Sequence, residues 1–578
     1  MNSLRTAKRF LFPLLGLWVL LYASFSLVKP PLLDGTDSIQ AEAAREMAVH
    51  GDWITPHVDG VRSLAVSPLL TWSTAASFKL FGVADWAARL PLAFYALALF
   101  ILTLALGSRL FLTPVAGFYA ALILLTSEGI FLFAHLLYPQ ILSTLWLTLA
   151  LYFFWRSLRH EHASRGTAVG FAVACGLGVL SQGLAGLVLP VVIVLLFLAI
   201  TRNLRHLLRW HPALGVLVFL LIVLPWHIAV HRANAIYPHL VAGPGLQSAP
   251  VLLVWAFLFL WIAPWCFFSV AALVRLPARV SPHSKHMDPS HQARLLLLLW
   301  LGVVALFVAF TRRQEFSVLP ALPALALLGA GWLAADEAAP SYTGRVFAWI
   351  FFVGGVIKAV VALFLAVRAP SPAPGADIAT LLHLHPGQHH VFLGHIADLT
   401  FASMGEFRIP LYISAAALLV GVAANLVFRL RNQTRLANCF LAGMMVFLLI
   451  AAHIALNTFS PVVSSAVLAE AIKPEMNPGD VVVVDGHYRD ASALGFYLER
   501  PIYLVNAQSD DLGRFSSDNP SLFMTPSSLE SDWSGPGRVF LWTTPRTAPN
   551  LPGSVYLIGR DGGREILSNQ PNSGGASF

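Results

Sequence analysis

The sequence predicts a polytopic α-helical membrane protein that ends in a small α/β domain. Of the 578 residues, 57% are hydrophobic and only 11% are charged, which is more apolar surface than one soluble core buries. The apolar residues gather in segments of roughly 17 to 25 residues, the length that crosses a bilayer as a helix. After residue 457 the composition changes, and charged residues, Gly and Pro separate short β-branched runs.

About thirteen of these apolar segments are candidate membrane spans. The first follows a basic start and lacks a small-residue cleavage site, so we expect an uncleaved helix rather than a signal peptide. The segments lie near residues 10–28, 89–110, 114–134, 138–155, 167–183, 185–200, 212–230, 251–274, 295–311, 317–335, 345–367, 409–428 and 437–457.

The basic residues predict how the chain is oriented. The formal charge of +8 could indicate nucleic-acid binding, but most Arg and Lys lie in short loops between apolar segments, where they act as orientation signals. With a cytoplasmic N-terminus, the basic loops that face the cytoplasm contain Arg156, Arg159, Arg165, Arg202, Arg205, Arg209, Arg275, Arg279, Lys285, Arg294, Arg429, Arg431 and Arg435. We therefore expect no nucleic-acid partner and an extracytoplasmic C-terminal domain.

The same pattern divides the chain into two domains. Residues 1–457 form the transmembrane domain, which includes a first external loop at 29–88, and residues 458–578 form the soluble domain. In the soluble domain, apolar runs at 481–485, 501–505, 539–542 and 555–558 predict buried strands. The three cysteines all lie inside predicted spans, which excludes a disulfide framework and a CxxC metal site.

Acidic residues concentrate in the first external loop, just outside the first span. The Ala-rich stretch in the middle of this loop has helical spacing and predicts a helix along the membrane surface. That spacing is expected to turn Glu42 and Glu46 toward solvent, and Asp52 is expected to close a turn. Asp34 and Asp37 come just before this stretch, so they either cap a helix or act as catalytic carboxylates.

Several short motifs of this loop occur in a fixed order. They are the acidic cluster at 34–37, AEAAREM at 41–47, GDW at 51–53, Pro56, Gly60, SPLLTW at 67–72, FGV at 81–83 and ARLP at 88–91. Together they resemble the GT-C glycosyltransferases, in particular the family of the aminoarabinose transferases that act on lipid A and the protein O-mannosyltransferases. Later segments agree more loosely: SQGL at 181–184, LPW at 224–226, RRQEF at 312–316 and LPALP at 319–323.

The resemblance implies transfer of a sugar from a polyprenyl-phosphate donor to a lipid (lipid A-like) or protein acceptor at the outer face of the plasma (inner) membrane. Asp37 or Asp34 would be the catalytic base or orient the acceptor. Arg313 stands where many members carry a Lys near the donor phosphate, and Arg312 adjoins it. Guanidinium groups bind phosphate oxygens bidentately, although both arginines could instead anchor a helix end at the interface.

Four positions depart from the family pattern. Thr36 and Gln140 replace aspartates, Ala65 replaces a glutamate that takes part in metal binding in some members, and Gln182 replaces a lysine. The resemblance therefore allows a divalent metal without requiring one.

Two other interpretations compete with an active transferase. The four substitutions favour a catalytically impaired relative that binds the lipid carrier or serves as a partner subunit. A transporter would need ionisable residues inside the spans, and the spans carry almost none. A further cluster, His383, His385, His389 and His390, could bind a metal, but it fits a solvated external loop better.

Overall fold

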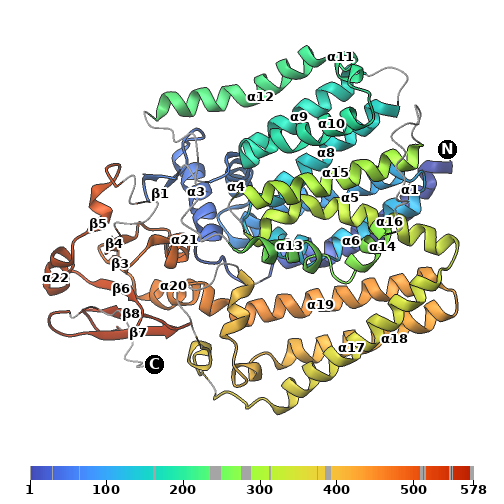
Figure 1. Cartoon of the computed structure of the whole chain (residues 1–578). Coiled ribbons are helices and arrows are strands. Elements are labelled where there is room, and N and C mark those ends of the chain that lie inside the picture. The colour runs from blue at the N-terminus through green and yellow to red at the C-terminus, as the bar shows by residue number, and fades with distance from the viewer. Residues whose placement is uncertain are drawn as a thin grey trace.

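The computed structural model describes residues 2–28, 30–63, 66–159, 164–234, 249–274, 288–311, 314–373, 375–383, 392–507, 512, 516–545, 549 and 551–572. Long helices fill the larger part of the molecule, and a small sheet domain sits at one end of them (Figure 1). The N-terminus lies at the opposite end of the helices from this sheet domain (Figure 1).

Every predicted span falls on a helix or on a pair of helices. In chain order these are α1 Asn2–Trp18, continued by the π-helix η1 Val19–Ala23 and α2 Ser24–Ser26; α5 Asp85–Leu110; α6 Pro114–Leu125 and α7 Glu128–His135; α8 Gln140–Arg159; α9 Arg165–Gln182; α10 Ala185–Ile200; α12 Pro212–Ala233, preceded by α11 Arg205–Arg209; α13 Val251–Leu260 and α14 Cys266–Val274; α15 Pro289–Phe310; α16 Leu322–Ala338, preceded by the 3-10 helix η2 Glu315–Ala321; α17 Tyr342–Arg368; α18 Arg408–Leu430; and α19 Thr434–Val463.

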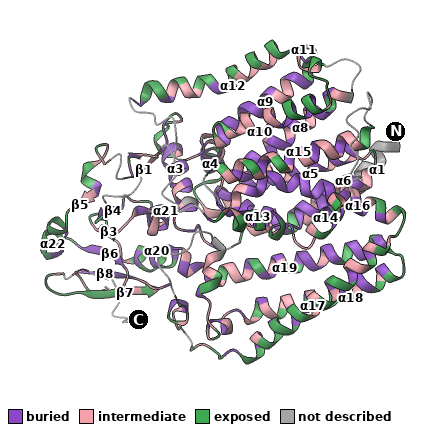
Figure 2. Cartoon of the chain, in the orientation of Figure 1, coloured by how far each residue is buried: buried purple, intermediate pink, exposed green. Residues whose placement is uncertain are grey.

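Length and composition qualify eight helices of the described chain as membrane spans, and the bent pair α6–α7 would make nine. Three shorter apolar helices, Phe10–Ser26, Ala185–Ile200 and Val251–Leu260, add to these. Figure 2 shows that buried residues concentrate on the central helices, whereas α12 exposes most of its surface. Only 11% of the most apolar stretch of α12 is buried, against 83% for the stretch that contains α16, so α12 packs little against the rest of the described chain.

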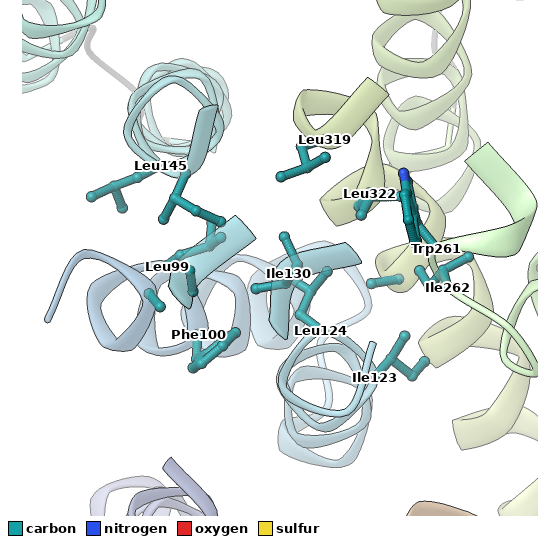
Figure 3. Close-up of a cluster of buried hydrophobic side chains, with 14 of the residues drawn as sticks. Leu99, Phe100, Ile123, Leu124, Ile130, Leu145, Trp261, Ile262, Leu319 and Leu322 are labelled. Carbon is teal, nitrogen blue, oxygen red and sulfur yellow. The ribbon is translucent and has the colours of Figure 1, made fainter. Parts of the chain in front are cut away.

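Two of the predicted spans are broken, and the breaks meet in the core. Helices α6 and α7 bend by 55° at Thr126, and α13 and α14 are separated near Trp261. The Gly129 amide donates to the Trp261 carbonyl oxygen at 3.1 Å, and Trp265 Nε1 donates to Thr126 Oγ1 at 3.1 Å. Figure 3 shows Trp261 close to Ile130 in the buried core. Polar backbone in hydrocarbon needs such partners.

Gly129 makes this close approach possible. A Cβ atom on Gly129 would lie 2.6 Å from Trp261 Cβ, a distance that real Cβ atoms do not tolerate.

The first external loop forms α3 Thr36–His50, the hairpin strands β1 His57–Val58 and β2 Val61–Arg62, and α4 Pro68–Phe81. Helix α3 lies between the bundle and the sheet domain (Figure 1), which confirms the predicted helix. It ends at Gly51, whose φ of +79° suits glycine. Asp52 Oδ1 then accepts the amides of Ile54 at 2.9 Å and Thr55 at 3.1 Å, so it closes the predicted turn.

The expectation that Glu42 and Glu46 face solvent is wrong. Glu42 is 0% exposed and Glu46 is 6% exposed, because the hairpin and the sheet domain cover this face of α3. The helical spacing itself is correct, but local spacing does not reveal which distant segment packs on a face.

The sheet domain confirms each of the predicted strands. They are β3 Val481–Asp485, β4 Tyr503–Val505, β6 Val539–Thr543 and β7 Tyr556–Asp561, to which the structure adds β5 Phe523–Met524 and β8 Arg564–Ser568. The strand order is β5-β4-β3-β6-β8-β7, and only β8 runs antiparallel to its neighbours, β6 and β7. The helices are α20 Ala466–Ile472, α21 Ser492–Leu498 and α22 Pro526–Ser534. Helix α19 continues to Val463, a short way past the predicted boundary at 457.

Candidate functional site

Asp37 lies in the first turn of α3 and is buried against the bundle, with 2% of the residue exposed. Its Oδ2 accepts the Leu33 amide at 2.9 Å, and its Oδ1 accepts the Leu137 amide at 2.7 Å. Leu137 belongs to the connection between α7 and α8. The carboxylate therefore joins the start of α3 to the connection that follows the broken span.

Arg89 of α5 faces the same carboxylate. Its Nη2 atom lies 3.6 Å from Asp37 Oδ2, which is an ion pair without a hydrogen bond. The guanidinium donates instead to the carbonyl oxygens of Pro30 at 2.6 Å and Pro31 at 2.9 Å. We call residues 30–37 the Asp37 strap, because Arg89 holds one end of this segment and Asp37 the other.

The bonding of Asp37 leaves it able to act as a base. A carboxylate offers about four lone-pair sites, and the amides of Leu33 and Leu137 occupy one on each oxygen. Burial raises the pKa of the Asp37 carboxyl above its ordinary value, and Arg89 and the two amides offset this only partly. A raised pKa makes the ionised carboxylate a stronger proton acceptor.

Asp34 is also buried, but its partners come from the sheet domain. Its Oδ2 accepts from Arg564 Nη1 at 2.6 Å and from Ser465 Oγ at 2.8 Å. Its Oδ1 accepts the Ala493 amide at 2.8 Å. Burial raises the pKa of the Asp34 carboxyl, and the positive charge of Arg564 opposes that rise. The structure thus places the two predicted aspartates on one strap, facing different domains.

A third group of carboxylates, not predicted as a site, combines Glu42 and Glu46 of α3 with Asp59 of the hairpin turn. Ligand atoms of Glu42, Glu46 and Asp59 come within 4.8 Å of one another, a set that could hold a divalent cation. Each carboxylate already has a protein donor: Arg45 Nε at 2.8 Å from Glu42 Oε2, the Gly60 amide at 3.1 Å from Glu46 and the Ile502 amide at 3.1 Å from Asp59. The signal in the sequence was the Asp59-Gly60 turn, which returns the chain to α3.

The predicted phosphate-binding residues Arg312 and Arg313 lie outside the described residues, as do Ala65, His385, His389 and His390. The chain that follows the two arginines is described. There the Phe316 ring packs on the Tyr138 ring at 4.9 Å between centroids. Tyr138 directly follows Leu137, the residue whose amide binds Asp37, so this chain segment approaches the Asp37 strap.

The other substituted positions are Gln140, Gln182 and Thr36. The Gln140 side chain is buried, and its Oε1 has no hydrogen-bond partner among the described residues. Gln182 is the last residue of α9 and is half-buried. The backbone of Thr36 begins α3.

Comparison with known proteins identifies relatives. Residues 4–240 match the family model for dolichyl-phosphate-mannose-protein mannosyltransferase. The undecaprenyl phosphate-alpha-4-amino-4-deoxy-L-arabinose arabinosyl transferase of Aeromonas hydrophila is 28% identical over 381 residues, which are 62% of this chain and 66% of that protein. The corresponding Edwardsiella ictaluri protein is 32% identical over 200 residues, 34% of this chain and 36% of that one.

Solved structures extend the likeness to the whole fold. ArnT from Cupriavidus metallidurans in the apo state superposes with a TM-score of 0.78 at 22% identity, over 99% of both chains. Its complex with undecaprenyl phosphate gives 0.77, over 97% of this chain and 98% of that one. The Archaeoglobus fulgidus oligosaccharyltransferase gives 0.50 at 13% identity, over 93% of this chain and 69% of that one. The chain is thus a polytopic membrane protein with the GT-C fold, related to the aminoarabinose transferases and the protein mannosyltransferases.

Proposed function

We propose that this protein transfers a sugar from a polyprenyl-phosphate donor to a lipid A-like lipid or a protein acceptor at the outer face of the membrane. The observation that carries this proposal is Asp37, a buried carboxylate fixed by two backbone amides on the external helix α3. The names of the relatives support the choice of donor, and one solved relative was crystallised with undecaprenyl phosphate.

Asp37 is the general base in this proposal. Its carboxylate takes the proton from an acceptor hydroxyl or phosphate, and the acceptor oxygen forms a bond to the anomeric carbon of the sugar. The bond between that carbon and the carrier phosphate breaks, and the polyprenyl phosphate leaves with the electron pair. Arg312 and Arg313 hold the departing phosphate by charge-assisted hydrogen bonds. No step requires a metal.

The proposed orientation puts this chemistry at the extracytoplasmic face of the membrane. The N-terminus is cytoplasmic, and the sheet domain and α3 are extracytoplasmic. The arginine-rich loops support this orientation, and the N-terminus and the sheet domain lie at opposite ends of the helices (Figure 1).

The test is transfer by the purified protein in detergent, with undecaprenyl-phosphate aminoarabinose as donor and lipid A as acceptor. Asp37→Asn and Arg313→Ala are compared with Asp288→Asn, which changes an exposed aspartate at the start of α15. We expect both site variants to lose transfer and the control to retain it. Transfer that persists in Asp37→Asn would refute the assigned base.

The second candidate function is a lipid-carrier-binding or partner subunit without transferase activity. Gln140 favours it, because a buried amide at this position supplies no negative charge. The same assay separates the two candidates, since tight binding of undecaprenyl phosphate without transfer across a panel of donors and acceptors would support the second one.

A further inference from the structure

We propose that Arg564 is a positioning residue: from the sheet domain it holds Asp34, and through Asp34 it sets the geometry of the Asp37 strap. The inference rests on the proposed function, since it assigns Asp34 to positioning and leaves Asp37 as the base.

The ion pair between Arg564 and Asp34 is shielded from solvent, and neighbouring residues hold the arginine in place. The side chains are 16% and 5% exposed, so water screens their interaction little. Arg564 Nη1 also donates to Ser465 Oγ at 3.2 Å, and its guanidinium lies over the Trp542 ring at 5.6 Å. These contacts help to orient the guanidinium independently of Asp34, as a positioning group requires.

Backbone contacts fasten the same part of the strap to the sheet domain and to the end of α19. The Asp34 amide donates to the Val463 carbonyl oxygen at 2.9 Å, and the Gly35 amide donates to Ser492 Oγ at 2.8 Å. Ser464 Oγ donates to the Leu32 carbonyl oxygen at 2.6 Å. Residues 32–35 thus take their position from chain that lies more than four hundred residues later.

The strap connects Asp34 to Asp37 through the Leu33 amide. The Leu33 amide is one of the two amides that bind the Asp37 carboxylate, and Leu33 directly precedes Asp34. A shift of Asp34 therefore displaces a donor that orients the proposed base. Displacing reacting groups by about 1 Å can cost roughly 100-fold in rate.

The bonding of Asp34 argues against a role as the base. Its two oxygens accept from Arg564, Ser465 and the Ala493 amide, and the first of these is a cation in direct contact. These three donors occupy both oxygens of Asp34 and leave fewer lone pairs free for an acceptor hydroxyl. Asp37 lies 3.6 Å from its arginine and lacks such a direct bond.

A second ion pair joins the same two regions and supplies a matched control. Arg62 of the hairpin donates to Asp518 through Nε and Nη2, both at 2.6 Å. This pair links the first external loop to the sheet domain as the Arg564 pair does, but it lies on the hairpin that follows α3, away from the strap. Removing it weakens the domain contact without touching the Leu33 amide.

The experiment compares full-length Arg564→Ala, Arg564→Lys and Arg62→Ala in two measurements. One is kcat and KM for transfer from undecaprenyl-phosphate aminoarabinose to lipid A. The other is hydrogen exchange of the backbone amides of residues 32–38. We expect Arg564→Ala to lower kcat by about 100-fold with little change in KM and to speed exchange in the strap. Arg564→Lys should recover part of both effects, and Arg62→Ala should show neither.

A double variant separates positioning from catalysis. If Arg564 acts only through Asp34, Asp34→Asn should lower kcat as Arg564→Ala does, and the double variant should show no further loss. A much larger loss in Asp34→Asn would overturn the assignment, as would equal kcat and exchange in Arg564→Ala and Arg62→Ala. If the wild-type protein showed no transfer activity, the proposed function would be refuted. The hydrogen-exchange measurement would still decide whether Arg564 holds the strap.

Discussion

Two buried aspartate–arginine pairs in this protein are equally shielded from solvent but differ in geometry. Asp336 of α16 and Arg429 of α18 are each 2% exposed at the side chain, and so are Asp37 and Arg89. Arg429 donates directly to Asp336 and also to Asn438. Arg89 stays 3.6 Å from Asp37.

The difference bears on the proposed role of Asp37. Asp336 also accepts the Ser341 amide at 2.8 Å, so the pair and its neighbours tie α16 to α17, α18 and α19. Asp37 and Arg89 bind main-chain groups instead, and their facing atoms can still bind something else. We infer that the first pair is structural and that the second is available to a substrate.

The largest effect that would sharpen this comparison is on catalysis. Asp37→Asn should lower the transfer rate per folded protein by about 10²–10⁴-fold, the usual contribution of a general base. Asparagine keeps one acceptor oxygen for two amides, so the variant should also lose about 1–3 kcal/mol of stability. Transfer kinetics and thermal unfolding in detergent measure the two effects separately. A loss of stability without a loss of rate would make both pairs structural.

The next effect is on stability at the structural pair. Arg429→Ala leaves Asp336 buried without its cation, which should cost about 3–5 kcal/mol. The double variant Asp336→Leu/Arg429→Met should recover most of this, because apolar side chains need no partner. Unfolding temperatures of the three proteins test the idea, and a double variant as unstable as Arg429→Ala would contradict it.

Arg89→Lys should have a smaller effect, centred on the strap. Arginine donates to two carbonyl oxygens at once, and a single ammonium group does not reproduce that fork. We expect a loss of about 1 kcal/mol for the missing hydrogen bond and a lower transfer rate. Exchange of the amides in residues 32–38 should rise as well. Unchanged exchange would show that Arg89 does not hold the strap.

The smallest effect is on the pH dependence of stability, and it concerns the carboxylate group of Glu42, Glu46 and Asp59. Burial raises the pKa of Asp59 well above its ordinary value, and Glu42 and Glu46 raise it further while Arg45 opposes them. The folded chain therefore keeps a proton that the unfolded chain releases near pH 4, so stability falls as pH rises through the folded pKa.

Asp59→Asn removes this titration and keeps an acceptor for the Ile502 amide. The variant should flatten the fall in unfolding temperature that begins as pH rises above about 4, with Glu46 leaving a residual slope because burial also raises its pKa. An Asp59→Asn profile parallel to the wild type would exclude Asp59 as the titrating group.

Local patterns were sufficient for most of the fold. Apolar length located the spans, helical spacing located α3, and β-branched runs located the strands, because each depends on neighbours in the sequence. The breaks near Thr126 and Trp261 were missed, since both lie inside segments whose average hydropathy is that of a continuous span. The burial of Glu42 was missed because distant chain provides the cover.

The candidate site was predictable only in part. Asp34 and Asp37 stood out as acidic residues next to a surface helix, and their side chains are only 5% and 2% exposed on one strap. Their partners were not predictable: Arg564 lies 530 positions from Asp34, and Leu137 lies 100 positions from Asp37. The roles of Arg312 and Arg313 stay predictions that rest on the family resemblance.

The meeting of the two broken spans has a consequence for how the chain is made. The Gly129 amide finds its partner in the Trp261 carbonyl oxygen, which leaves the ribosome much later. Hydrocarbon offers no substitute for that partner. We therefore expect the break between α6 and α7 to reach its final packing only after α13 and α14 have been synthesised.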